Sequence, residues 1–264
     1  MTSASSRAWL DDLAAQGRSH FTTADAVRGL GASLPAAHAV LSRLKRAGRV
    51  ASPYRGFYVV VPPQYRPLGC LPAELFIDQL MASLDVPYYV GLLSAAAYHG
   101  AAHQRPQRLQ VVVAASRRPV VCGRVEVDFV ARKDMEATPT VVRNTAAGTL
   151  RLSTAEATAL ELVGYADRCG GLDHVATVLS ELGEVMDAEA LVAAAALCPV
   201  VWVQRLGWLL EQAGHGELAS ALLPHVARRA NSPAPLVRSE AVRGAVRDPR
   251  WRLVLNADVQ PDDL

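Results

Sequence analysis

Residues 33–61 read SLPAAHAVLSRLKRAGRVASPYRGFYVVV, and this stretch decides the fold. Ser33 is a suitable N-cap for a helix, Pro35 is tolerated in a first helical turn, and Gly48 ends the helix. The apolar side chains inside the helix recur at the i, i+3, i+4, i+7 spacing that faces a core, and they are Ala37, Val40, Leu41 and Leu44. The stretch therefore begins with an amphipathic helix that ends at Ala47.

A small hairpin follows this helix in the same stretch. Val50–Ala51–Ser52 and residues 57–61 are rich in β-branched and aromatic side chains, which favours two short strands. The four residues Pro53–Tyr54–Arg55–Gly56 between these strands are typical of a turn. The sequence therefore predicts a helix followed directly by a two-stranded wing.

Two shorter helical patterns precede the amphipathic helix. The first stops at Gly17, and the second begins at Thr22 or Thr23 and stops at Gly31. Three short helices followed by a hairpin, in this order, predict a winged helix-turn-helix over residues 5–62.

The polar positions of the third helix and the tip of the wing form the candidate DNA-contacting surface. Small residues near the N-terminal end of the helix would let it approach base edges in the major groove. Arginines can reach guanine edges or phosphate, and a basic side chain at the hairpin tip suits the phosphate backbone or the minor groove. The predicted DNA-binding residues are Arg43, Arg46 and Arg55, with His38, Ser42, Lys45 and Arg49 in support. The alternative is a solvated basic helix in a winged helix that binds another protein, but helix order, wing and local charge together favour DNA.

The chain beyond residue 62 has a different organisation. Pro62, Pro63 and Pro67 form a stiff connector. The predicted fold class is α+β, with a winged helix-turn-helix at residues 1–62, a mixed helix and sheet unit at 63–145 and a mainly helical part at 146–264, the last two being either separate domains or one. At the start of the helical part, Ser153 and Glu156 have the spacing of a capping box.

Charge is distributed unevenly along the chain. Residues 1–62 carry eight Lys and Arg against three Asp and Glu, whereas residues 146–264 carry ten against fifteen. This asymmetry is expected if one end meets phosphate and the other meets a different partner. No apolar run is long enough for a membrane span or a signal peptide, so the sequence predicts a cytoplasmic protein without membrane contact.

The cysteines and histidines do not predict a metal site. The four cysteines are far apart in sequence and none belongs to a C-x-x-C motif, so they are interpreted as small buried hydrophobic residues rather than a zinc ribbon or a redox pair; they are Cys70, Cys122, Cys169 and Cys198. His99 and His103 have the i, i+4 spacing of two helical metal ligands, but Gly100 indicates that the helix is ending. A structural role is therefore favoured for these histidines, and no cofactor is predicted.

One constellation leaves an enzymatic alternative open. Glu126 and Asp128 lie two apart on a predicted strand, with Lys133 just beyond, and paired carboxylates with a lysine are what a metal-dependent nuclease needs. The competing interpretation is the solvent face of a half-buried strand, because Val125, Val127 and Phe129 would fill its other face. The sequence contains no nucleotide-binding or nucleophile motif, so a non-enzymatic protein is predicted.

Five segments occur in an order that resembles a known family. They are Arg55–Gly56–Phe57–Tyr58, then YVGLLSAAAYHG at residues 89–100, then Val111–Val112–Val113, Val127–Asp128–Phe129 and Leu152–Ser153–Thr154–Ala155–Glu156. Together they resemble the AbiEi antitoxins, the transcriptional-regulator half of abortive-infection toxin–antitoxin pairs. The similarity covers most of the chain.

The resemblance implies a function in two parts. The winged helix would bind inverted repeats in the promoter of its own operon and repress it, either as a monomer that binds cooperatively or as a weak dimer. The C-terminal part would counter a toxin of nucleotidyltransferase type, through direct contact or indirectly. The rival interpretations are a stand-alone ligand-responsive transcription factor, with its pocket in the central unit, and a nuclease that uses Glu126 and Asp128.

Overall fold

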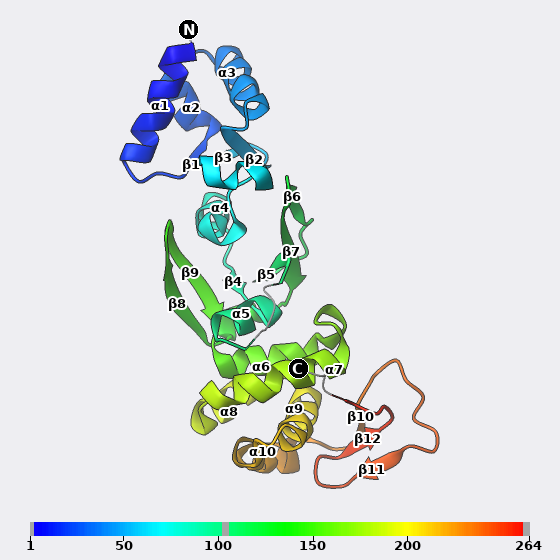
Figure 1. The fold of residues 1–264 in the computed structure, drawn as a ribbon. Coiled ribbons are helices and arrows are strands. Elements are labelled where there is room, and N and C mark those ends of the chain that lie inside the picture. The colour runs from blue at the N-terminus through cyan, green and yellow to red at the C-terminus, as the bar shows by residue number, and fades with distance from the viewer. Residues whose placement is uncertain (1–2, 102–105, 261–264) are drawn as a thin grey trace. The chain divides into compact units, whose positions relative to one another are not determined.

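The structure is a computed structural model that describes residues 3–101 and 106–260. Internal contacts divide the chain into two compact units. The N-terminal unit comprises Met1–Tyr89, Gln107–Lys133 and Val142–Arg151, and the C-terminal unit comprises Val90–Pro106, Asp134–Val141 and Leu152–Leu264. Helices and strands mix in the first unit and helices dominate the second (Figure 1), which confirms the predicted α+β class. The sequence-based boundaries at residues 62 and 145 remain predictions.

The first sixty residues fold as a winged helix-turn-helix, as predicted. Its elements are α1 (Ser3–Ala15), β1 (His20–Thr22), α2 (Thr23–Leu30), α3 (Leu34–Arg46), β2 (Val50–Tyr54) and β3 (Phe57–Val60). The strands form an antiparallel sheet in the order β1-β3-β2. The core beneath them consists of Leu10, Leu13, Phe21, Ala26, Leu30, Ala37, Val40, Leu41, Leu44, Val50 and Tyr58. All four core positions predicted for α3 are therefore buried.

Local hydrogen bonds fix where α2 begins and ends. Thr22 and Asp25 form a reciprocal capping box at the start of α2, and Gly31 closes the helix in the left-handed region with φ 55°. Burial alone would raise the pKa of Asp25, but hydrogen bonds from Thr22 and Arg28 lower this pKa to about 2. The start of α2 is thus held by a carboxylate whose ionised form is favoured.

Trp9 packs directly on Gly29, and this contact joins α1 to α2. A Cβ built on Gly29 would lie 2.1 Å from Nε1 of Trp9. The Trp9 ring also meets Phe21 edge-on, with ring centroids 4.8 Å apart. A glycine at this point of α2 therefore lets an indole lie against the helix backbone.

We expect Gly29→Ala to destabilise the winged helix. Alanine improves helix propensity by up to about 1 kcal/mol, but forcing a methyl group into a packed ring costs about 1–3 kcal/mol, so the clash outweighs the gain. Urea unfolding followed by circular dichroism measures the difference. Gly216→Ala is the matched control, because Gly216 begins a helix and has no atom within 4 Å of its Cβ position. Equal midpoints for the two variants would contradict the prediction.

The rest of the N-terminal unit continues from the wing. Its helical elements are η1 (Pro63–Leu68), η2 (Ala73–Leu75) and α4 (Ile77–Ser83), and its strands include β5 (Arg108–Val113), β6 (Val120–Cys122) and β7 (Val125–Ala131). Strands β4 (Tyr89–Val90), β8 (Thr140–Thr145) and β9 (Gly148–Ser153) have residues in both units. The sheet order is β6-β7-β5-β4-β9-β8, with β5 parallel and β6 antiparallel to β7. Strand β6 also lies beside β2 of the wing (Figure 1).

The C-terminal unit is mainly helical. Its helices are α5 (Leu92–Tyr98), η3 (Met135–Ala137), α6 (Ala155–Gly164), η4 (Ala166–Arg168), α7 (Gly171–Leu182), η5 (Gly183–Val185), α8 (Ala188–Ala195), α9 (Val200–Gln212) and α10 (Gly216–Arg229). A small sheet follows in the order β10-β12-β11, built from β10 (Ala234–Pro235), β11 (Val246–Asp248) and β12 (Leu253–Leu255). Helix α6 is buried from Ala155 to Val163, so it forms the centre of this unit. No helix among the described residues is long and apolar enough to cross a membrane.

The predicted capping box at the start of α6 is wrong by one residue. Strand β9 extends through Ser153, so Thr154 becomes the N-cap and accepts a hydrogen bond from the Ala157 backbone. Glu156 instead accepts a hydrogen bond from the backbone N–H of Asp187, at 3.0 Å. The carboxylate that the spacing assigned to a local cap therefore ties α6 to the start of α8.

A single tryptophan holds the terminal sheet against α9. Trp251 is fully buried, its indole N–H donates to Glu211 at 2.6 Å, and its carbonyl accepts a hydrogen bond from Gln204 at 3.1 Å. A Cβ built on Gly207 would lie 2.0 Å from the Trp251 ring, so the indole also lies against the α9 backbone. Hydrogen bonds and close packing therefore both hold Trp251 against α9.

Candidate nucleic-acid interface

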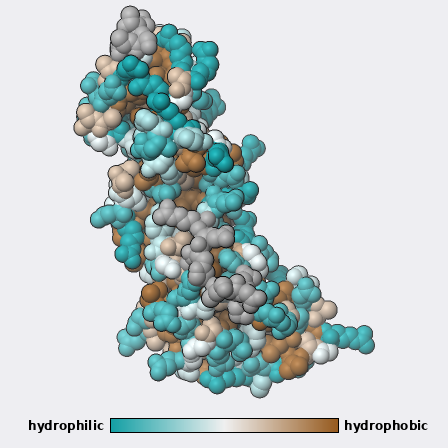
Figure 2. Space-filling view, viewed as in Figure 1, coloured by the Kyte–Doolittle hydropathy of each residue, from teal (hydrophilic) through white to brown (hydrophobic). Residues whose placement is uncertain are grey.

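Helix α3 presents an apolar face to the core and a polar face to solvent. The predicted contact residues His38, Ser42, Arg43, Lys45 and Arg46 are all exposed. The surface over α3 in Figure 2 is mostly hydrophilic. In the described part of the chain, no acidic side chain forms a salt bridge with Arg43 or Arg46. Both guanidinium groups therefore keep their donors available for an external anion.

The N-terminal half of α3 is narrow enough to approach DNA closely. Ala36, Ala39 and Ser42 are exposed and spaced three apart, so they follow one side of the helix. Arg43 and Arg46 continue near this side in the last turn, and the same i, i+3 spacing makes them neighbours. Small side chains followed by two arginines are an arrangement that lets a helix enter a major groove about 12 Å wide and contact bases and phosphate.

The wing is tighter than the sequence predicted. Tyr54 pairs with Phe57, so the turn consists of Arg55 and Gly56 alone and strand β2 runs two residues further than expected. An irregularity between Ala51 and Tyr54 accommodates Pro53, which has no N–H for the ladder. The hydroxyl of Ser52 donates to the carbonyls of Tyr54 and Phe57, at 2.9 and 3.1 Å. Arg55 is consequently exposed at the tip of a well-fixed turn.

Two of the supporting residues have partners inside the protein. Arg49 is half-buried, and its Nη2 lies 3.8 Å from a carboxylate oxygen of Asp11, which ties the hairpin to α1. Lys45 is exposed but lies close enough to the thiol of Cys122 to favour its ionised form. Arg49 therefore has a structural task beside any contact with DNA.

Two exposed apolar side chains on this surface escaped the sequence reasoning. Leu34, at the first turn of α3, is 52% exposed, and Tyr54, at the end of β2, is 39% exposed. An apolar side chain near a recognition helix can contact the methyl group of thymine. Leu34 lies three residues before Ala37, where the helical periodicity continues the core face, so no local signal reported its exposure.

The acidic residues of the enzymatic alternative lie on β7. Glu126 forms an ion pair with Arg108, with Nε and Oε2 2.6 Å apart, and the parallel register places these two residues side by side. Glu126 and Asp128 are half-buried between the buried positions Val125, Val127 and Phe129, as the competing interpretation predicted. Lys133 is exposed beyond the strand. Among the described residues, no group of three His, Cys, Asp or Glu side chains could hold a metal ion.

His99 has a structural contact in the C-terminal unit. It is the C-cap of α5, and its Nε2 lies 2.8 Å from the carbonyl oxygen of Ser153. Its proposed partner, His103, lies outside the described residues.

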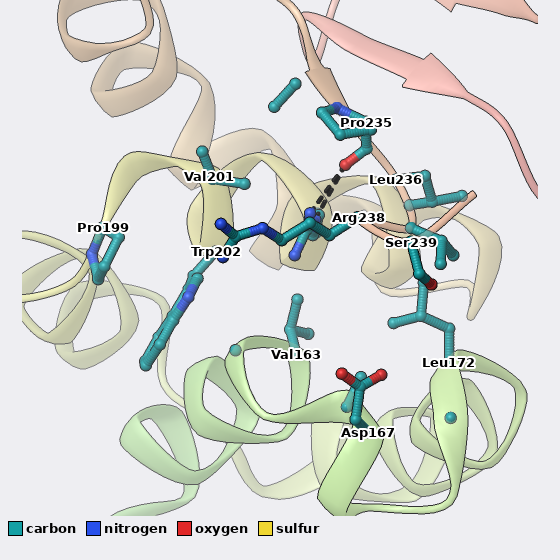
Figure 3. A pocket seen from close by; sticks show the side chains of 16 residues that line it. Val163, Asp167, Leu172, Pro199, Val201, Trp202, Pro235, Leu236, Arg238 and Ser239 are labelled. Atoms are coloured by element: carbon teal, nitrogen blue, oxygen red, sulfur yellow. Dashed lines mark hydrogen bonds between the residues drawn. The ribbon is translucent and has the colours of Figure 1, made fainter. Parts of the chain in front are cut away.

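A cavity of about 840 Å³ lies in the C-terminal unit, between α6, α7, α9 and the segment around β10 (Figure 3). Arg205 donates two hydrogen bonds to the carbonyl of Pro235, at 2.9 and 3.1 Å, and burial followed by the charge of Arg238 lowers the pKa of Arg205. In Figure 3, Arg238 extends across the cavity toward Trp202 and Asp167 faces it from the opposite wall. The cavity lies outside residues 63–145, where the ligand-responsive alternative placed its pocket.

Comparisons with known proteins agree along the chain. A family model described as the AbiEi antitoxin C-terminal domain matches residues 89–212, and one described as a transcriptional regulator, AbiEi antitoxin, matches residues 10–61. No curated protein matches the chain. Among solved structures, the RV2827C protein from Mycobacterium tuberculosis is similar with a TM-score of 0.70 at 19% sequence identity, over 96% of this chain and 92% of that one. The likeness to the RV2827C protein shows a shared fold. The two family models match a C-terminal-domain segment and a regulator segment of the chain.

Proposed function

The chain belongs to the AbiEi antitoxin family, and from this premise we propose that it represses its own toxin–antitoxin operon and counters a nucleotidyltransferase-type toxin. The family supports an antitoxin that is also a transcriptional regulator. The observation that carries the DNA-binding half is the polar face of α3, where Arg43 and Arg46 are exposed beside small side chains. Phosphate neutralisation by such arginines supplies affinity, and contacts of their forked donors with guanine supply selectivity.

The proposed contact surface combines the helix and the wing. Arg43 and Arg46 reach base edges or phosphate in the major groove, and Arg55 contacts the backbone or the adjacent minor groove. His38, Ser42 and Lys45 support these contacts from the same exposed face, and Arg49 contributes less because Asp11 shares its charge. Inverted repeats would receive two copies of this surface, one on each half-site, through cooperative binding of monomers or a weak dimer.

The proposed antitoxin part is the acidic end of the chain. Residues 146–264 carry ten Lys and Arg against fifteen Asp and Glu, whereas residues 1–62 carry eight against three. An acidic helical part repels non-specific DNA and attracts a basic protein surface. We therefore assign DNA reading to residues 1–62 and toxin neutralisation to the C-terminal part, with residues 63–145 between them.

Fluorescence anisotropy of the purified chain on the DNA upstream of its own gene tests the proposal. We expect selective binding that weakens steeply with salt, since several phosphates are neutralised, and no selective binding to a scrambled duplex of the same composition. Co-expression with the toxin encoded beside the gene is expected to restore growth. Equal affinity for both duplexes would refute the repressor half, and growth arrest despite soluble protein would refute the antitoxin half.

A further inference from the structure

Two segments that are far apart in sequence run side by side below the wing. The backbone N–H of Arg124 donates to the carbonyl of Leu68 at 2.7 Å. A Cβ built on Gly123 would lie 2.9 Å from the Cα of Gly69, so these two glycines face each other at closest approach. Residue 68 therefore contacts residue 124, and residue 69 contacts residue 123, where the end of η1 meets the turn between β6 and β7. The next residue on each side of this contact is a cysteine, and the side chains of Cys70 and Cys122 interact.

The two cysteines are therefore neighbours in space, although they are far apart in the sequence. A disulfide spans Cα atoms about 4.4–6.8 Å apart, which is a separation that residues with contacting side chains can have. Each thiol lies close enough to the other to shift its pKa. Cys70 is fully buried and Cys122 is half-buried. A partly exposed cysteine thus lies beside a fully buried one.

The surroundings of the pair favour the ionised form of the Cys122 thiol and disfavour that of the Cys70 thiol. The hydrogen bond from Cys70 lowers the pKa of Cys122 against the effect of burial, and the Ser52 backbone and the charge of Lys45 lower it further. The hydrogen bond to Cys122 and burial raise the pKa of Cys70. A thiolate is the nucleophilic form of cysteine, so Cys122 is the sulfur that attacks and Cys70 is the one that resolves.

We propose that Cys70 and Cys122 are a redox modification site that forms a reversible disulfide on reaction with a hydroperoxide. The Cys122 thiolate attacks the peroxide O–O bond, takes one oxygen as a sulfenic acid, and releases water or an alcohol after protonation. The Cys70 sulfur then attacks the sulfenic sulfur, the S–O bond breaks, and water leaves with the Cys70 proton. The dithiol has lost two electrons to the peroxide, and a small thiol reductant returns them.

The site is positioned to act on the DNA-binding surface. The groups that favour the Cys122 thiolate are the Ser52 backbone in β2 and the side chain of Lys45 on α3. A disulfide carries no charge, so oxidation removes the anion that faces Lys45 and fastens residue 70 to the end of β6. Transient, regulatory disulfides of this kind are the ones that occur in reducing compartments.

Peptide mapping of the full chain after treatment with hydrogen peroxide tests the proposal. We expect a Cys70–Cys122 crosslinked peptide, the loss of two titratable thiols and complete recovery with dithiothreitol. Cys122 should react about tenfold faster than Cys198, which is also half-buried and lies between α8 and α9. Both cysteines recovered in reduced form while Cys198 is oxidised would overturn the proposal.

Single cysteine variants test separately whether Cys122 is the attacking sulfur and Cys70 the resolving sulfur. Cys122→Ser is expected to leave Cys70 unreactive, and Cys70→Ser is expected to leave a sulfenic acid on Cys122 that dimedone traps. Cys198→Ser is the control and should form the crosslink at the wild-type rate. If Cys70→Ser does not fold, detection of the crosslink in the wild-type chain still tests the proposal, because that experiment needs no substitution. Equal thiol loss in Cys122→Ser and the wild type would contradict the assignment.

Discussion

Replacing Arg43 and Arg46 together by alanine is expected to abolish selective binding to operator DNA and to leave the fold intact. Both side chains are exposed, whereas the α3 core positions Val40, Leu41 and Leu44 are unaffected by the change. Each specific arginine contact contributes about 1–3 kcal/mol, so affinity should fall by at least about thirtyfold. If both contact phosphate, the slope of log affinity against log salt should also decrease in magnitude by about two.

A matched control separates this effect from a change in net charge. Arg228→Ala with Arg229→Ala removes the same two charges from exposed positions at the end of α10, in the C-terminal unit. Anisotropy titrations of both double variants, at several salt concentrations, should show wild-type selectivity for the α10 variant alone. If both variants bind the operator as the wild type does, α3 is not the recognition helix.

Trp251→Ala is expected to be the most destabilising single substitution in the C-terminal unit. The side chain is fully buried, so its truncation should cost about 3–5 kcal/mol, which is a large part of the 5–15 kcal/mol that stabilises a typical domain. The change also removes the donor that Glu211 accepts from at 2.6 Å. Loss of this anchor should detach the β10-β12-β11 sheet from α9.

Urea unfolding of the full chain measures this loss, with Trp208→Ala as the control. Trp208 is on α9, the helix that Trp251 packs against, but it is half-buried, so its truncation removes less packed surface. We expect a clearly lower midpoint for Trp251→Ala than for Trp208→Ala, and earlier proteolysis of residues 231–260. Coincident midpoints would show that Trp251 does not anchor the sheet.

The winged helix could be predicted from sequence because its signals are local. The spacing of Ala37, Val40, Leu41 and Leu44 fixes the buried face of α3, and the exposed face follows by exclusion. The turn of the wing was placed less well, because the irregularity that absorbs Pro53 depends on pairing with β3. Periodicity therefore identifies a face, whereas register needs the partner strand.

The cysteine pair and the capping of α6 were not predictable for the same physical reason. Cys70 and Cys122 meet only because the end of η1 packs against the turn between β6 and β7, and no local pattern in the sequence reports this contact. Glu156 has the spacing of a local cap with Ser153, but β9 extends through Ser153 and moves the N-cap to Thr154. The backbone N–H of Asp187, at the start of α8, then donates to Glu156 instead. Whether a side chain bonds a local or a distant partner therefore depends on how the chain folds in space.

The glycines that lie under aromatic rings restrict how this chain can diverge. Gly29 and Gly207 leave room for indoles that a methyl group would displace, and Gly164 does the same beneath Trp202. Neither member of such a pair can change size alone without loss of stability, so the two positions drift as one unit. Among relatives of this chain, a larger residue in place of a glycine should therefore occur together with a smaller residue in place of its tryptophan. Each glycine and its tryptophan should therefore behave in evolution as one coupled position, although the two residues are separated in the sequence.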